Sequence, residues 1–177
     1  MLVKESHGFV CMPGGFGTLD ETFELLTLTQ TGKGVPVPIV FLDVPGDRYW
    51  TEVEDFIRDQ LVSRSLVDRS DLDLFTRTDS AQVAAQTILN FYRNYHSMRY
   101  VGELIILRLH RAPTEAHLKD LNQAFAPIIK DGEIRILDDK SLARRDPGAP
   151  QLVRLAFPFG RHNFGDLHRM IAEVNRF

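Results

Sequence analysis

The stretch FVCMPGGFGTLDETFE, residues 9–24, decides the fold of the first half of this 177-residue chain. The short apolar run at 8–12 is typical of a buried strand, and a proline and two glycines end it. Apolar residues then recur at helical spacing, and Thr18 with Glu21 fits a capping box at the start of a helix. The stretch therefore predicts a strand, a glycine-rich turn and a helix whose first turn carries Glu21.

The same alternation of strands and helices continues to about residue 95. Further buried strands are expected at 38–42 and 73–76, and amphipathic helices at 50–61 and 80–92. This order favours a parallel sheet with crossover helices. Because three strands are few for such a sheet, we expect an α/β, doubly wound fold that lacks its N-terminal strands.

The pattern changes after residue 96. Strands are expected at 102–109, 133–137 and 152–157, and helices at 113–132 and 163–174. This β-α-β-β-α order predicts a small α+β domain. We therefore expect an α/β domain over residues 1–97 and a second, α+β domain over residues 98–177.

Composition narrows the class of protein. The chain is 44% hydrophobic and 25% charged, with a net charge of −3, which is ordinary for a globular protein. A basic face for nucleic acid is not expected, and no apolar run is long enough to span a bilayer. The N-terminus lacks a signal-peptide pattern, and the single cysteine cannot form an intrachain disulfide. These features predict a cytoplasmic protein with neither a nucleic-acid nor a membrane partner.

The glycine-rich turn suits an anion. A helix N-terminus presents unpaired N–H groups and a partial positive charge, and glycines let the backbone approach phosphate oxygens. The spacing matches neither the dinucleotide-binding fingerprint nor the Walker A loop. The alternative is a simple turn followed by a helix cap, with no ligand.

Residues 9–24 resemble the signature of the LOG family, P-G-G-x-G-T-x-x-E, and the resemblance continues through residues 25–33 and at Tyr49-Trp50. LOG proteins are cytokinin-activating phosphoribohydrolases and their bacterial relatives, often labelled lysine decarboxylases. The resemblance implies a Rossmann-like fold, a homodimer, and hydrolysis of the N-glycosidic bond of a nucleoside 5′-monophosphate such as AMP. It covers residues 1–95, and the tail is similar to the extra C-terminal domain of longer bacterial members.

The resemblance also implies roles for individual residues. Glu21 is the expected catalytic carboxylate, because cleavage builds positive charge on the sugar that a carboxylate stabilises while activating water. Glu24 is expected to orient Glu21 or bind a ribose hydroxyl, with a solvated or dimer-facing role as the alternative. For Glu21 the alternative is helix capping alone. The residues expected to hold the phosphate are Gly14, Gly15, Gly17 and Thr18.

One departure from the family bears on activity. Family members carry an Arg-Lys pair shortly before the strand that precedes P-G-G, and by spacing this pair would fall before Met1. We therefore expect the chain to be part of a longer protein or to be inactive alone, with weak or no turnover. The rival hypothesis is a module that binds a nucleotide without cleaving it. A third treats the C-terminal domain as a structural dimer or regulatory element.

Other reactive residue types are not expected to form sites. None of the six histidines has metal-ligand spacing, so no metal is predicted. Cys11 precedes the glycine turn on a buried strand and is expected to be a small core residue. No motif supports a pyridoxal-phosphate lysine, so we predict no cofactor.

Overall fold

A computed structural model describes residues 6–137, 146, 149 and 151–177. The chain divides into two compact units, of which the first contains a parallel sheet and the second an antiparallel sheet. The expected α/β fold followed by a small domain is confirmed. The first unit is Met1–Phe91 with Asn163–His168, and the second is Tyr92–His162 with Arg169–Phe177.

The sheet of the first unit has the strand order β1-β2-β3, with both neighbouring pairs parallel. These strands are β1 (Phe9–Cys11), β2 (Ile39–Leu42) and β3 (Thr76–Thr78). The expectation of a strand at 73–76 was wrong in position. Asp68 and Asp71 form a capping box, in which the carboxylate of each accepts the backbone N–H of the other. This box caps a 3-10 helix over Arg69–Leu74, so the strand begins only after that helix.

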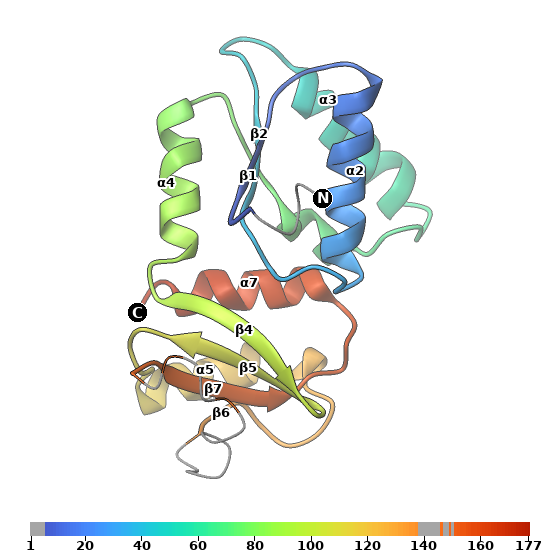
Figure 1. Ribbon diagram of the computed structural model, residues 1–177. Coiled ribbons are helices and arrows are strands. Elements are labelled where there is room, and N and C mark those ends of the chain that lie inside the picture. The colour runs from blue at the N-terminus through green and yellow to red at the C-terminus, as the bar shows by residue number, and fades with distance from the viewer. Residues whose placement is uncertain (1–5, 138–145, 147–148, 150) are drawn as a thin grey trace. The chain divides into compact units, whose positions relative to one another are not determined.

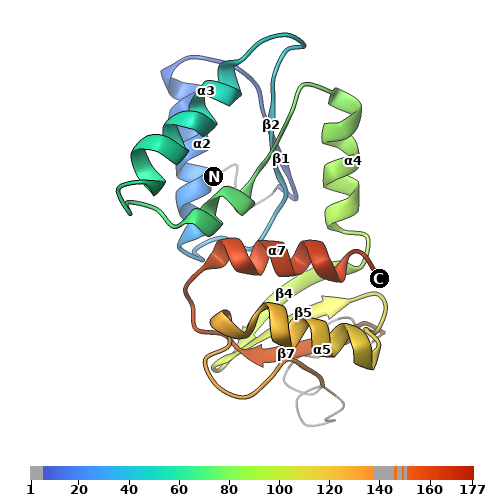
Figure 2. The same cartoon turned by 180° about the vertical axis from the view of Figure 1, so that it is seen from behind.

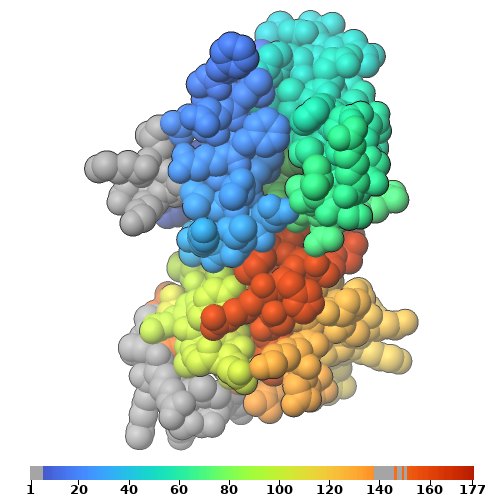
Figure 3. Space-filling model, turned by 90° about the vertical axis from the view of Figure 1, so that its right-hand side faces the viewer, coloured from blue at the N-terminus to red at the C-terminus, as the bar shows by residue number. Residues whose placement is uncertain are grey.

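Helices cover both faces of this sheet: α2 and α3 lie on one face and α4 on the other (Figure 1). Their bounds are Phe16–Gln30 for α2, Tyr49–Phe56 for α3 and Ala81–Phe91 for α4. The chain continues from α3 as a π-helix over Ile57–Val62, so the helix predicted at 50–61 comprises two segments. In the space-filling view of Figure 3, α2, in blue, forms part of the exposed surface of this unit.

The core of the first unit attaches α2 and α3 to the central strand. Phe41 of β2 and Trp50 of α3 are both fully buried, and their rings stack at 4.2 Å between centroids. Phe75 stacks on the other side of Phe41 at 4.3 Å. Leu25 of α2 and Ile39 belong to the same apolar cluster. This packing fixes where the first turns of α2 and α3 lie relative to the sheet.

The second unit contains an antiparallel sheet with α5 (Glu115–Ala124) on one face (Figure 2). The final helix, α7 (Phe164–Val174), contributes its residues from Arg169 onward to this unit. The strand order is β4-β5-β7-β6. Its strands are β4 (Tyr95–Val101), β5 (Leu104–Leu109), β6 (Arg135–Ile136) and β7 (Val153–Pro158).

Two sequence predictions for this unit need correction. Strand β4 was not predicted, because His96, Ser97 and Arg99 interrupt its alternation of apolar residues and its first residues were assigned to a domain boundary. It pairs with β5 through a turn at Gly102, whose φ is +62°. The helix predicted at 113–132 ends at Ala124, and a 3-10 helix with Pro127 in its first positions follows.

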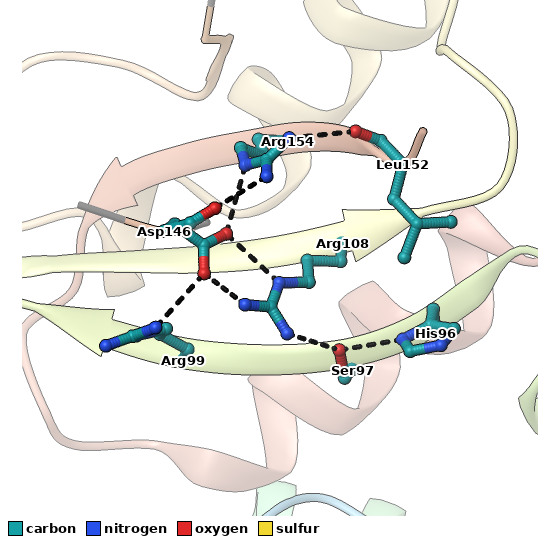
Figure 4. Close-up of polar contacts among 7 residues, drawn as sticks. All are labelled: His96, Ser97, Arg99, Arg108, Asp146, Leu152 and Arg154. Atoms are coloured by element: carbon teal, nitrogen blue, oxygen red, sulfur yellow. Dashed lines mark hydrogen bonds and ion pairs between the residues drawn. The ribbon is translucent and has the colours of Figure 1, made fainter. Parts of the chain in front are cut away.

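A buried carboxylate joins three strands of the second sheet (Figure 4). The side chain of Asp146 is fully buried and accepts hydrogen bonds from Arg99, Arg108 and Arg154. Arg108 and Arg154 lie directly opposite each other on β5 and β7. The Arg154 Nη2 atom also donates to the Asp146 backbone carbonyl at 2.7 Å. Asp146 therefore connects β4, β5 and β7 on one face of the sheet.

Within the ranges that the structure describes, no helix is both long enough and apolar enough to cross a bilayer.

Candidate functional site

The first turn of α2 begins earlier than the sequence predicted. Gly15 is the N-cap residue, and the first i→i−4 bond runs from the Leu19 N–H to the Gly15 carbonyl at 3.2 Å. Thr18 thus lies inside the first turn, and Glu21 lies in the second. The predicted capping box is wrong: the N-cap makes no side-chain hydrogen bond, and the first turn holds no acidic residue. Glycine is itself a good N-cap residue, so the helix starts as soon as the glycines allow.

Three backbone amides at this end of α2 point out of the helix without an intrahelical acceptor. The N–H groups of Phe16, Gly17 and Thr18 precede the first i→i−4 bond. Among the residues described, no protein atom accepts from them. Unpaired amides at a helix N-terminus carry partial positive charge and attract anions.

The three glycines of the turn differ in what surrounds them. A Cβ atom at Gly14 would collide with the Thr18 side chain, whose Cβ would be only 2.8 Å away. At Gly15 and Gly17, an added Cβ would meet nothing within 4 Å. Neither has a positive φ. Packing therefore explains glycine at 14, whereas at 15 and 17 the space that a side chain would occupy is open.

A pocket of about 490 Å³ extends from this turn along α2 and β1. This volume is within the range of small-molecule sites. Gly17, Thr18 and Glu21 all line it, so the structure brings together three of the residues that the sequence singled out. Its other lining residues are Phe9, Val10, Cys11, Met12, Pro13, Thr22 and Leu25.

The two glutamates of α2 are both exposed. Glu21 faces the pocket, and Glu24 lies three residues further along the helix. Neither side chain makes a hydrogen bond or ion pair with another residue in the described ranges. Since Glu21 is not at a capping position, helix capping does not explain a glutamate there.

Tyr49 contacts the glycine turn from α3. Its hydroxyl donates a 2.8 Å hydrogen bond to the Gly14 carbonyl, across 35 positions of sequence. The resemblance includes Tyr49-Trp50, but the sequence predicted no contact between Tyr49 and the loop. This contact could not be predicted from the sequence, because it depends on how α3 packs against the sheet.

Asp43 fixes the start of α3. It directly follows β2, and its Oδ1 atom accepts the backbone N–H of Trp50 at 2.9 Å. Asp43 is buried, and its own N–H donates to the Thr78 carbonyl at 2.9 Å. Asp43 therefore joins the end of β2 to β3 through its backbone N–H and to the first turn of α3 through its carboxylate.

Cys11 lines the pocket as a thiol. Burial raises the pKa of Cys11 above its ordinary value of 9.0, and a hydrogen bond with the Thr22 side chain partly offsets that increase. The thiolate, which is the reactive form, is therefore disfavoured at neutral pH. Among the described residues, no group of three or more His, Cys, Asp or Glu is placed to hold a metal ion.

Comparison with known proteins agrees with the motif. The family described as "Possible lysine decarboxylase" matches residues 1–88. A protein of Oryza sativa subsp. japonica, named "Probable cytokinin riboside 5'-monophosphate phosphoribohydrolase LOGL3", is 32% identical over 95 residues. That match covers 54% of this chain but only 43% of the rice protein, so the chain spans less than half of that relative. The family match over residues 1–88 includes the glycine turn, α2 and the residues that line the pocket. Over residues 1–88, the chain therefore belongs to the LOG family.

Proposed function

We propose that the pocket binds a nucleoside 5′-monophosphate and that this unit hydrolyses its N-glycosidic bond, releasing the free base and ribose 5-phosphate. The observation that carries the proposal is that Gly17, Thr18 and Glu21 line one pocket of about 490 Å³. The relative's name supports the same reaction class. We propose AMP and similar adenine nucleotides as substrates.

The phosphate is proposed to bind at the first turn of α2. There the amides of Phe16, Gly17 and Thr18 lack protein acceptors among the described residues, and no atom fills the side-chain positions of Gly15 and Gly17. The Gly14 peptide and the Thr18 hydroxyl complete this set of contacts. A phosphate dianion would gain from several N–H donors and from the helix dipole.

Glu21 is proposed to act at the ribose. It lies three residues beyond Thr18, about one helical turn of 5.4 Å pitch along α2. A ribose bound between them would place its anomeric carbon near the Glu21 carboxylate. As the bond to the base breaks, positive charge develops on the sugar; the carboxylate stabilises it and directs water to the anomeric carbon. Glu24, one turn further, is proposed to contact a ribose hydroxyl.

The base is proposed to occupy the apolar remainder of the pocket. Beyond Glu21 the lining comes from Leu25 of α2 and from Phe9, Val10 and Cys11 of β1. Apolar side chains favour burial of the flat faces of a heterocycle.

A second candidate function is binding without cleavage. One observation favours it: Glu21 is exposed, and no other residue in the described ranges hydrogen bonds to its carboxylate. Catalytic side chains are usually held by neighbours, and a loosely held carboxylate loses catalytic efficiency.

The test is to incubate the purified chain with AMP, follow adenine by chromatography, and measure AMP binding by calorimetry. The wild-type chain is expected to release adenine weakly at most, and Glu21→Gln should abolish that release and leave AMP binding nearly unchanged. Asp20→Asn, an exposed neighbour on α2, is the matched control and should match the wild type. AMP binding without release would favour the binding module, and absence of AMP binding would refute both functions.

The remaining family expectations belong to the same proposal. We propose a homodimer, which light scattering of the purified chain tests directly. We also propose a domain boundary near residue 97 and a cytoplasmic location. Limited proteolysis and cell fractionation are the respective measurements.

A further inference from the structure

The hydrogen bond between Tyr49 and Gly14 has a directional consequence for the glycine turn. The Tyr49 hydroxyl donates to the Gly14 carbonyl at 2.8 Å. The structure has no cis peptide bond, and in a planar trans peptide the C=O and the following N–H point in opposite directions. The Gly15 N–H therefore points away from Tyr49, on the opposite side of the peptide.

Tyr49 is held in place by its neighbours. Trp50 is fully buried, its backbone N–H donates to the Asp43 carboxylate, and its ring stacks on Phe41. The Tyr49 ring meets the Trp50 ring edge-on at 4.9 Å between centroids. A side chain anchored to the core in this way can hold a mobile partner in one orientation.

The glycine turn needs such a constraint. Gly14 and Gly15 have no side chains, so this peptide has more rotational freedom than any other pair of residues would give. On its other side, Gly14 is packed against the Thr18 side chain. The turn is otherwise exposed.

We propose that Tyr49 is a positioning residue that orients the Gly14–Gly15 peptide so that the Gly15 N–H joins the phosphate-binding amides. The inference rests on the proposed function, because it names a residue that prepares the same phosphate site. Tyr49 contacts the loop and not the substrate. Its hydroxyl removes rotational freedom from the loop before a ligand binds, which lowers the entropy cost of binding.

The experiment compares the full chain with Tyr49→Phe, which removes only the hydroxyl. Calorimetric titrations use ribose 5-phosphate, AMP and adenosine, which lacks the phosphate. We expect Tyr49→Phe to weaken the binding of ribose 5-phosphate and of AMP by about fivefold, which is the effect of one hydrogen bond. The affinity for adenosine should not change. Tyr100→Phe in the second unit removes a phenol hydroxyl elsewhere and should bind all three like the wild type.

A second measurement needs no ligand. In ¹⁵N relaxation experiments, the Gly15 amide order parameter should fall from about 0.85 in the wild type toward 0.6 in Tyr49→Phe. Unchanged mobility of Gly15, or equal weakening of all three ligands, would overturn the role of Tyr49. If the wild type binds neither phosphate ligand, the proposed function fails, while the relaxation experiment still decides whether Tyr49 orders the loop.

Discussion

The side chain of Thr18 lies against Gly14 so closely that a Cβ atom on Gly14 would be 2.8 Å from the Thr18 Cβ. At Gly17, three residues further along the chain, an added Cβ would meet no atom within 4 Å. The same glycine-rich turn thus contains one glycine required by packing and another that packing does not require.

This difference predicts that the two alanine variants separate stability from binding. Gly17→Ala should stabilise α2 by roughly 0.5 to 1 kcal/mol, because alanine loses less backbone entropy on folding. It should weaken the binding of ribose 5-phosphate, because Gly17 lines the pocket and an added methyl group would take up space proposed for the phosphate. Gly14→Ala should destabilise the unit by about 1 to 3 kcal/mol through overpacking against Thr18.

Urea unfolding followed by Trp50 fluorescence measures the stabilities, and calorimetry measures the affinities. The chain's only tryptophan lies in the first unit, so the fluorescence reports on the unit that contains the turn. A Gly17→Ala protein that binds ribose 5-phosphate as tightly as the wild type would refute the assignment of this space to a phosphate.

The raised pKa of Cys11 predicts that its thiol is alkylated slowly, and a nucleotide bound in the pocket should slow the reaction further. Burial raises this pKa above 9.0, so the reaction with iodoacetamide should be slow at pH 7 and accelerate steadily through pH 9 as thiolate forms. Because Cys11 and Glu21 line the same pocket, saturating AMP should protect the thiol. Mass spectrometry of the single cysteine gives the rate. An alkylation rate unaffected by AMP would show that the nucleotide does not occupy this pocket.

Asp146 predicts an acid-sensitive second unit. The hydrogen bond from Arg108 is the main factor that lowers the pKa of Asp146 below its ordinary value of 3.8. A carboxylate whose pKa is lower in the folded state stabilises that state above the unfolded pKa, and the stabilisation is lost as pH falls through the folded pKa. Wild-type stability should therefore decline below about pH 4.

The matching variant is Asp146→Asn, which leaves Arg108 and Arg154 largely buried without their counter-charge. We expect a loss of roughly 3 kcal/mol at pH 7, measured by urea unfolding followed by circular dichroism. Arg99→Ala should cost less than about 1 kcal/mol, because that arginine is 46% exposed. Equal losses in the two variants would contradict the central role of Asp146.

The buried His168 predicts a second pH dependence of stability, at higher pH than that of Asp146. Burial lowers the pKa of His168 from 6.5 to about 4, and its Nε2 atom has no hydrogen-bond partner among the described residues. Between these values the unfolded chain takes up a proton that the folded chain excludes. Stability should therefore fall as pH drops from about 6.5 to 4.

Replacing His168 with leucine should remove this slope. The exposed His162→Gln serves as the comparison and should keep it. Urea midpoints at half-unit pH intervals, read from Trp50 fluorescence, measure the effect. A slope that persists in His168→Leu would assign the pH dependence to another group.

The sequence alone determined the main features of the first unit. Short apolar runs ended by glycine and proline predicted β1 and β2, and helical periodicity predicted α2 and α4. Gly32, with φ of +65°, directly follows the C-cap residue Thr31 and ends α2, as is usual for glycine. The nine-residue motif was specific enough to indicate the family, because six of its nine positions are fixed and all six match in this chain.

Tertiary structure decided what local pattern could not. Thr18 and Glu21 fit a capping box in sequence, yet the helix starts at Phe16, because an N-cap glycine met the local requirement earlier. Strand β4 pairs with β5, and its interrupted alternation of apolar and polar residues carried no clear strand signal. The Tyr49–Gly14 and Asp146–Arg154 contacts join residues that are neighbours only after the sheets assemble. Periodicity reports which face of an element is buried, whereas the partner of each polar group depends on the packing of distant segments.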